Sequence, residues 1–246
     1  MYPGIKTFTN FENYIVLVIF TMNKLYSSID LKRLNKNKHI TFLNKKENIK
    51  GIDNKRKAIF FDRDGVLIND VNYIKRPEEV NLLNGVIDVI KYAKKMGFLI
   101  FVITNQSGIA RGFFTWEDYE KVSKKMLEII NFPEAICAIY ANGEGPNNLD
   151  NNSWRKPNPT MILRAAKDFN LDLENSILVG DRLSDLISGE KAGIKNLVHV
   201  STGHGVNERI KIIEKYSNLT ERFNLSMIND LTSFPSNELF SKKKIF

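Results

Sequence analysis

Acidic residues follow short apolar segments at two places in this chain of 246 residues, in a pattern that suits metal and phosphate chemistry. Asp62 and Asp64 come directly after residues 58–61, and Asp181 follows residues 176–179 and one glycine. Carboxylates gathered at one site repel one another strongly where water is excluded. A hard divalent cation relieves that repulsion, and Mg2+ prefers a few carboxylates together with water and substrate phosphate. The three carboxylates therefore predict a magnesium site.

The same residue types can transfer a phosphoryl group. A metal-bound carboxylate can attack phosphorus and form an aspartyl phosphate. A second carboxylate two residues further along can protonate the leaving oxygen and then activate water. The Thr104 hydroxyl and the Lys156 ammonium would neutralise the oxygens of the transferring group.

Each of these motifs alone is weak evidence, because Asp and Gly are common turn residues after strands. Their occurrence together and in order, each at an expected strand end or helix start, favours a functional site. The alternative that stays open is a site that keeps its residues but has lost its activity.

Apolar segments alternate with helical patterns along the chain, which predicts how these side chains are positioned. The expected strands are residues 58–61, 98–103, 135–140, 176–179 and 196–200. The expected helices cover residues 84–96 and 115–130, a third opens at 158–159, and a short fourth ends near 191. This alternation indicates an α/β, Rossmann-like three-layer sandwich with a mostly parallel central sheet. Ligands bind beyond the carboxyl ends of such strands, so Asp62, Thr104 and Asp181 should lie close together.

Four motifs resemble those of the haloacid dehalogenase superfamily of phosphohydrolases. They are residues 61–65, 104–112 (TNQSGIARG), 155–157 and 179–182. The chain is most similar to the D-glycero-D-manno-heptose-1,7-bisphosphate 7-phosphatase family and its histidinol-phosphatase relatives. The resemblance covers about residues 57–235. The links 62–85 and 104–115 are too short to hold a large cap domain.

The resemblance implies a role for each catalytic position. Asp62 would be the nucleophile and Asp64 the general acid/base. One Mg2+ would be held by Asp62, by the backbone carbonyl of Asp64 and by Asp181. Thr104 and Lys156 would stabilise the phosphoryl group.

The resemblance also implies a set of substrate-binding residues. These are Asp70, Tyr73, Asn105, Gln106, Ser107, Arg155 and Arg182. The planar fork of Arg155 suits a second phosphate, whereas Asp185 is expected to orient its neighbours rather than to bind metal. The leading substrate is heptose 1,7-bisphosphate, from which the 7-phosphate would be removed. Histidinol phosphate or another small sugar phosphate is the alternative, and a nucleic-acid end-processing or binding protein is less favoured.

Two departures from the family pattern bear on the substrate. The family often carries a zinc-binding loop of Cys and His before the Arg-Lys-Pro motif. Here those positions are Ala141, Gly143, Asn152 and Trp154, none of which is a zinc ligand, so we expect no zinc. Arg182 stands where the bisphosphatases usually have Lys, which keeps the charge and changes the geometry.

The charge distribution separates the chain into parts. The net charge of +8 lies within residues 1–57, whereas the remaining residues hold 24 basic and 24 acidic side chains. We therefore expect a basic, poorly ordered extension at 1–56, the phosphatase domain at 57–235 and a tail at 236–246. Because the body is neutral, no nucleic-acid partner is expected. A single Cys and no apolar run of membrane-spanning length predict a cytoplasmic protein without a membrane partner, and we expect a monomer.

Overall fold

The structure is a computed structural model that describes residues 54–132, 135–146, 153–219 and 222–240, together with the backbone of two strands at 16–19 and 39–44. Within these residues the strands are β1 (Val16–Ile19), β2 (His39–Asn44), β3 (Ala58–Phe61), β4 (Leu99–Asn105), β5 (Ile136–Asn142), β6 (Ile177–Gly180), β7 (Asn196–Val200) and β8 (Asn224–Ile228). The helices are α1 (Val86–Lys95), α2 (Ser107–Ala110), α3 (Trp116–Ile130), α4 (Thr160–Phe169), α5 (Leu183–Ala192), α6 (Gly205–Tyr216) and α7 (Ser236–Leu239). Two 3-10 turns, η1 (Pro77–Glu79) and η2 (Leu231–Ser233), complete the elements.

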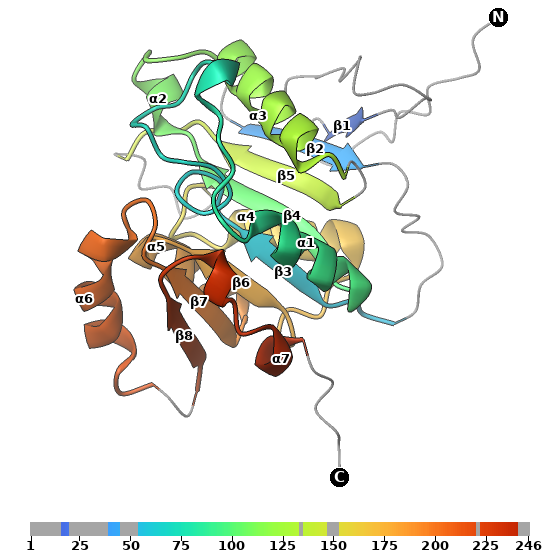
Figure 1. Cartoon of the computed structure of the whole chain (residues 1–246), viewed down its shortest axis with the longest axis vertical. Helices are drawn as coiled ribbons and strands as arrows, with labels where there is room; N and C mark the ends of the chain where they lie inside the picture. Colours follow the sequence, from blue (N-terminus) through green and yellow to red (C-terminus); the bar gives the residue numbers. More distant parts are fainter. Residues whose placement is uncertain are drawn as a thin grey trace, which may run out of the picture.

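Strand β3 lies in the middle of a sheet whose order is β1-β2-β5-β4-β3-β6-β7-β8 (Figure 1). Neighbouring strands are parallel except β2 and β5. The chain passes outward from β3 through β4 to β5 and then returns to the opposite side of β3 at β6. Ligands of open α/β sheets bind where the strand order reverses in this way. The predicted three-layer sandwich with a mostly parallel sheet is confirmed.

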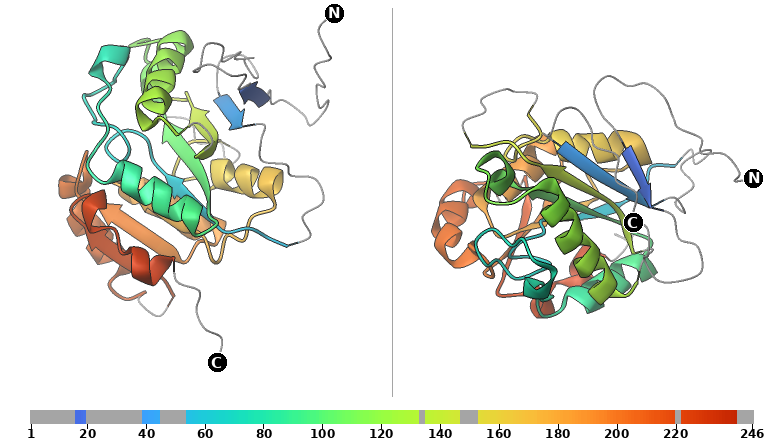
Figure 2. Two further views of the ribbon diagram at one scale, coloured as in Figure 1. Left: turned by 45° about the vertical axis from the view of Figure 1, so that its right-hand side comes forward. Right: turned by 90° about the horizontal axis from the view of Figure 1, so that it is seen from above.

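Helices cover both faces of the sheet, as Figures 1 and 2 show. Ile59 and Phe61 of β3 pack on the face under α1, α3 and η2. Ala58 and Phe60 point to the opposite face, under α4, α5 and α6. Because both faces are buried, the central strands are apolar at every position rather than at alternate ones.

Local sequence signals explain where the helices begin and end. The Thr115 hydroxyl accepts a hydrogen bond from the Asp118 amide, and the Asp118 carboxylate accepts one from the Thr115 amide. This reciprocal cap begins α3 at the predicted residue. Helix α1 ends next to Gly97, whose positive φ of 80° suits the end of a helix. The predicted links 62–85 and 104–115 contain only η1 and α2 as helical elements.

The packed structure continues past the expected boundary at 235, through α7 to Phe240. The Phe240 side chain is 2% exposed and belongs to the core beneath α1. Its ring lies 4.9 Å from that of Phe98 and 5.4 Å from that of Tyr92. Strands β8, β1 and β2 were not predicted either. β8 mixes polar and apolar residues and is only partly buried, so it has no apolar run.

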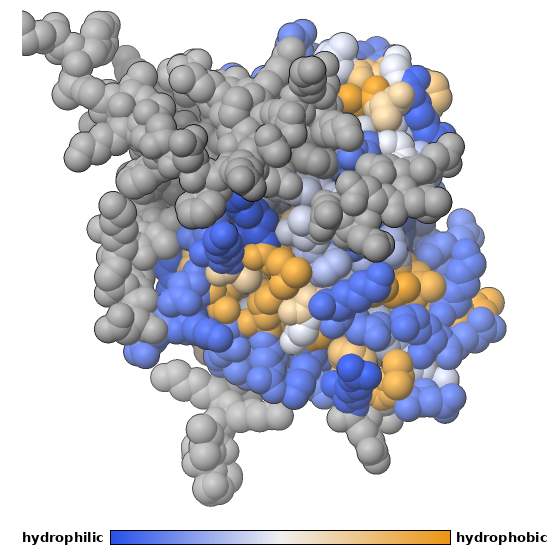
Figure 3. Space-filling model, turned by 180° about the vertical axis from the view of Figure 1, so that it is seen from behind, coloured by the Kyte–Doolittle hydropathy of each residue, from blue (hydrophilic) through white to orange (hydrophobic). Residues whose placement is uncertain are grey.

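The expected extension at 1–56 contains β1 and β2, and β2 pairs with β5. Most of its other residues lie outside those described, so its expected disorder stays a prediction. Figure 3 shows a largely hydrophilic back surface on which apolar residues form separate patches. Among the described residues, no helix is both long and apolar enough to span a bilayer.

Replacing Phe240 with Ala tests the packed C-terminal end. Removal of a buried phenyl ring should lower the free energy of unfolding by about 3 kcal/mol. The same change at Phe132, which is 40% exposed, should lower it by less than about 1 kcal/mol. Urea unfolding of the two variants measures the difference. Equal losses would show that residue 240 does not belong to the core.

Candidate active site

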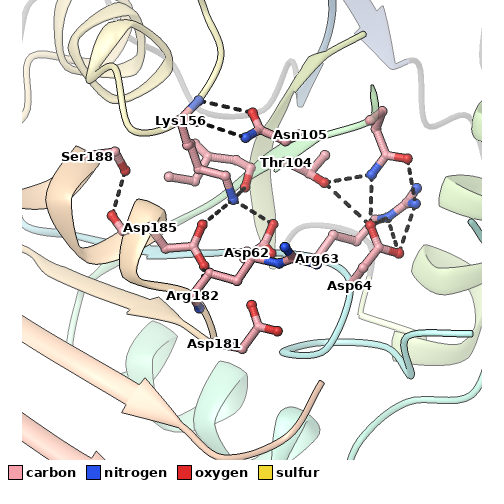
Figure 4. Close-up of polar contacts among 12 residues, drawn as sticks. Asp62, Arg63, Asp64, Thr104, Asn105, Lys156, Asp181, Arg182, Asp185 and Ser188 are labelled. Carbon is pink, nitrogen blue, oxygen red and sulfur yellow. Dashed lines mark hydrogen bonds and ion pairs between the residues drawn. The ribbon is translucent and has the colours of Figure 1, made fainter. Parts of the chain in front are cut away.

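The carboxyl ends of three adjacent strands bring the predicted catalytic side chains together (Figure 4). Asp62 follows β3, Thr104 lies near the end of β4, and Asp181 follows β6. Lys156 reaches the same place from the segment between β5 and α4. The register pairs Phe61 of β3 with Val102 of β4 and Val179 of β6, so Asp62, Thr104 and Asp181 each follow this level by one or two residues.

Lys156 forms the centre of this site. Its Nζ lies 2.8 Å from Asp62 Oδ1 and 2.7 Å from Asp185 Oδ1, and it donates to the Ile103 carbonyl at 3.1 Å. Burial alone would lower the pKa of this amine, but Asp185 and Asp62 raise it above its usual value. Lys156 therefore carries a positive charge next to the predicted nucleophile.

The carboxylates outnumber this ammonium. Ligand atoms of Asp62, Asp181 and Asp185 lie within 4.8 Å of one another. Burial raises the pKa of Asp62 to about 7, with Asp185 and Asp64 adding to the rise and Lys156 opposing it. Burial, Asp185 and Asp62 raise the pKa of Asp181 to about 9. The charge balance of the cluster thus favours a further cation.

Asp181 offers an oxygen for such a cation. Its Oδ2 accepts a hydrogen bond of 2.7 Å from the His204 amide, whereas its buried Oδ1 has no hydrogen-bond partner among the described residues. Asp185 is engaged differently, because Lys156 takes one of its oxygens and the Arg182 amide donates to the other. The residues present therefore fit a divalent cation on Asp62 and Asp181, with Asp185 orienting Lys156.

Two glycines allow the backbone to close around Asp181. A Cβ atom would lie 2.8 Å from Asp181 Oδ2 if built on Gly65 and 2.5 Å from it if built on Gly203. Both residues also have positive φ. The Thr202 hydroxyl donates to the Gly65 carbonyl and ties the two loops together. The loop after β7 was not among the predicted site residues. The only signal was the family-like stretch 201–205.

Asp64 points away from the metal cluster. Gln106 Nε2 donates to Asp64 Oδ2 at 2.8 Å, and Thr104 Oγ1 lies 3.5 Å from the same oxygen. The guanidinium of Arg63, a residue to which the sequence analysis gave no role, contacts both Asp64 oxygens. Two carboxylates only two residues apart thus have separate surroundings.

Asn105 and Gln106 differ from their expected place among the substrate-binding residues. Asn105 donates to the Lys156 carbonyl at 3.1 Å and accepts from the Lys156 amide at 3.0 Å. Gln106 is buried and bonds to Arg63, Asp64 and Thr104. The polar atoms of both side chains bond to other predicted site residues, so both hold those residues in place. Ser107 begins α2 and is partly buried.

The remaining predicted substrate residues line the outer part of the site. Asp70 Oδ2 lies 3.0 Å from His204 Nε2. Tyr73 packs edge-on against Phe113, with ring centroids 4.8 Å apart. Arg111, which the sequence analysis did not name, lies 5.9 Å from the centroid of the Tyr73 ring.

Three guanidinium groups at this outer part, those of Arg111, Arg155 and Arg182, are near enough for their like charges to interact. Burial, Arg111 and Arg182 lower the pKa of Arg155, whereas Glu144 opposes the shift. Arg155 Nη1 also donates to the Glu144 carbonyl at 3.3 Å. The mutual repulsion of like charges that act on Arg155 favours an anionic ligand beside it.

The described residues at the positions of the family's zinc ligands are Ala141, Gly143 and Trp154, and none has a side chain that binds zinc. Ala141 and Trp154 are buried in the two cores. Asn152 lies outside the described residues.

The raised pKa values of Asp62 and Asp181 predict how Mg2+ changes stability with pH. Between its ordinary pKa of 3.8 and its raised one, each carboxyl binds more protons when folded than when unfolded, so the metal-free protein loses stability as pH rises. Mg2+ needs the ionised carboxylates and relieves their repulsion. The rise in melting temperature on adding Mg2+ should therefore be larger at about pH 9 than at about pH 6.

Thermal unfolding with Mg2+ and with chelator measures this difference. Asp181→Asn should remove most of the increase at both pH values. An increase of equal size at both pH values, or one that persists in Asp181→Asn, would contradict the proposed ligands.

Comparisons with known proteins agree with this geometry. Residues 57–226 match the family described as polynucleotide kinase 3 phosphatase. The chain is 38% identical over 146 residues to a D-glycero-beta-D-manno-heptose-1,7-bisphosphate 7-phosphatase of Helicobacter pylori, covering 58% of this chain and 83% of that protein. It is 36% identical over 181 residues to a D-glycero-alpha-D-manno-heptose-1,7-bisphosphate 7-phosphatase of Campylobacter jejuni, covering 72% and 99%.

Solved structures give the same result. A putative haloacid dehalogenase-like phosphatase from Mesorhizobium loti superposes with a TM-score of 0.64 at 29% identity, over 84% of this chain and 93% of that one. The D,D-heptose 1,7-bisphosphate phosphatase of B. bronchiseptica, complexed with magnesium and phosphate, gives 0.62 at 28% identity, over 74% and 97%. This chain is therefore a haloacid dehalogenase-like phosphatase and belongs to the same family as the D-glycero-D-manno-heptose-1,7-bisphosphate 7-phosphatases.

Proposed function

We propose that this phosphatase removes the 7-phosphate of D-glycero-D-manno-heptose 1,7-bisphosphate with the help of one Mg2+. The observation that carries the proposal is the group of three guanidiniums, at Arg111, Arg155 and Arg182, at the outer part of a site centred on Lys156 and Asp62. A substrate with two phosphates would place the reacting phosphate at Lys156 and Asp62 and the other phosphate at the three guanidiniums. The names of the relatives support the same substrate.

Asp62, Asp181 and the backbone carbonyl of Asp64 would hold the Mg2+. The ion supplies charge neutralisation, which lets an anionic phosphate approach a carboxylate. The excess of carboxylates over ammonium groups and the unpaired Oδ1 of Asp181 support this assignment. No zinc is proposed.

In the first step the Asp62 carboxylate attacks phosphorus, and the bond between phosphorus and the sugar oxygen breaks. Asp64 donates a proton to that oxygen, so the sugar leaves as an alcohol. Lys156 is held by Asp62 and Asp185 and directs its ammonium at the transferring group. The Thr104 hydroxyl, next to Asp64, adds a hydrogen bond to the phosphoryl oxygens.

In the second step Asp64 takes a proton from water, which attacks the phosphorus of the aspartyl phosphate. The bond to Asp62 breaks, inorganic phosphate leaves, and both carboxyl groups return to their starting state. The hydrogen bonds from Gln106 keep Asp64 beside the reacting oxygen in both steps.

The outer residues would bind the other end of the sugar. Arg155, Arg182 and Arg111 would hold the 1-phosphate, for which planar guanidiniums are suited. Asp70 and Tyr73 would contact the sugar between the two phosphates.

We also propose that the protein acts as a monomer and that it is located in the cytoplasm. Cys137 is the single cysteine of the sequence and is buried, so no disulfide framework stabilises the fold, which suits a reducing compartment. Histidinol phosphate and other small sugar phosphates remain alternative substrates because they would use the same catalytic residues. A phosphorylated nucleic-acid end is a further alternative, which the description of the matching family supports.

Release of inorganic phosphate from a panel of substrates tests the proposal. The panel holds both anomers of heptose 1,7-bisphosphate, histidinol phosphate, common sugar phosphates and a 3′-phosphorylated oligonucleotide, each with Mg2+ and with chelator. We expect the highest kcat/KM for a heptose bisphosphate and no turnover with chelator. Asp62→Asn should lower turnover by at least about a thousandfold, because it removes the nucleophile. Faster turnover of another panel member would keep the mechanism and reject the substrate.

Replacing Arg155 with Met tests the second phosphate site. Loss of a charge-assisted contact of about 1.5–3 kcal/mol should raise KM for the bisphosphate about 10- to 100-fold with a smaller change in kcat. For the corresponding heptose 7-phosphate, KM should change by less than about threefold. Steady-state kinetics on the two substrates measures the contrast. Equal changes in KM would show that Arg155 does not bind the 1-phosphate.

A further inference from the structure

Arg63 is a fully buried cation between the two catalytic aspartates. Its side chain is 0% exposed and is among the largest fully buried side chains of the described residues. A buried ion pair is weak evidence for stability, because desolvation offsets much of the attraction between the charges. The burial of this arginine therefore calls for a reason other than the stability of the fold.

The guanidinium of Arg63 holds Asp64 on both oxygens. Nε lies 3.2 Å from Oδ1 and 3.1 Å from Oδ2, and Nη2 lies 3.0 Å from Oδ1. The other contacts fix the guanidinium itself. Nη1 donates to Ser123 Oγ at 3.3 Å, Nη2 also donates to Gln106 Oε1 at 3.1 Å, and the Tyr119 ring lies 4.7 Å away.

Gln106 closes this network from the other side. Its amide oxygen accepts from Arg63, while its amide nitrogen donates to Asp64 Oδ2 at 2.8 Å and to Thr104 Oγ1 at 2.7 Å. Asp64 thus accepts hydrogen bonds from Arg63 and Gln106 and a longer one from Thr104, and its side chain keeps 21% of its surface exposed. A carboxylate with two rotatable bonds is in this way limited to one orientation that still reaches solvent.

We propose that Arg63 is a positioning residue that holds the Asp64 carboxylate in line for proton transfer with the leaving oxygen and the attacking water. The proposal rests on the function proposed above, because it takes Asp64 as the general acid/base. Lys cannot replace Arg here, since an ammonium lacks the planar fork that spans both carboxylate oxygens and Gln106. Arg63→Lys keeps the charge and removes the fork.

The test compares two substrates that differ in how much the leaving oxygen needs a proton. Benzyl phosphate releases an alkoxide unless a general acid acts, whereas p-nitrophenyl phosphate releases a stable anion. The ratio kcat/KM reports only the steps up to departure of this group, so later hydrolysis of the aspartyl phosphate does not enter. Arg63→Lys and Arg63→Met should lower kcat/KM for benzyl phosphate about 10- to 100-fold and for p-nitrophenyl phosphate less than about threefold.

A double variant decides whether Arg63 acts through Asp64. Asp64→Asn should show the same contrast between the substrates, and Arg63→Lys with Asp64→Asn should be no slower than Asp64→Asn alone. Arg164→Lys is the matched control, because Arg164 Nε pairs with both oxygens of Asp168 within α4. That variant should stay within about twofold of the wild type on both substrates. If Arg63→Met fails to fold by circular dichroism, Arg63→Lys carries the comparison.

Equal losses on both substrates, or additive losses in the double variant, would overturn the proposal and give Arg63 a purely structural role. The behaviour of Asp64→Asn alone tests the proposed mechanism on which the role of Arg63 rests. If Asp64→Asn showed no contrast between the substrates, Asp64 would not be the general acid, and a role for Arg63 through it would fall as well. Because neither test substrate is a heptose, the outcome does not depend on which sugar phosphate the protein hydrolyses.

Discussion

The arrangement of the active site depends on one ammonium group placed among several carboxylates. Lys156 contacts Asp62 and Asp185 directly, whereas Asp181 stays buried with an oxygen that no described residue satisfies. Buried charges of this kind are tolerated only when hydrogen bonds from surrounding residues hold each charged group in a fixed position. Asn105 holds the backbone of Lys156 at both its amide and its carbonyl, and the loops at Gly65 and Gly203 close tightly on Asp181. The central position of β3 brings these supports to one edge of the sheet.

Two carboxylates that are almost adjacent in the chain are given different chemistry by their surroundings. Asp62 faces Lys156 and the acidic groups Asp181 and Asp185, which together could hold a divalent cation. Asp64 faces the buried guanidinium of Arg63 and the amide of Gln106. Pairs of titratable groups with contrasting surroundings are typical of acid/base catalysis. Under the proposed mechanism, this contrast would separate the nucleophile, Asp62, from the proton donor, Asp64.

The sequence predicted the five central strands, and the meeting of polar side chains at their carboxyl ends, because both depend on local patterns. Apolar runs marked the buried strands, and Thr115 marked the start of α3 through its cap. Strand β8 and Phe240 were missed because their burial comes from tertiary packing and leaves no run of apolar residues. The roles of Asn105, Gln106 and Arg63 depend on where side chains meet across different elements, and residue type alone does not specify that. The same holds for Arg111, which joins Arg155 and Arg182 only in the folded chain.

The central claim is that the phosphoryl group passes through Asp62, the carboxylate next to Lys156. Rapid acid quenching after mixing the protein with substrate labelled at the reacting phosphate, followed by peptide mapping, tests it most directly. The account predicts an alkali-labile phosphoryl label on the peptide that contains Asp62, which disappears in Asp62→Asn. Turnover without a labelled peptide, or a label on another residue, would contradict it.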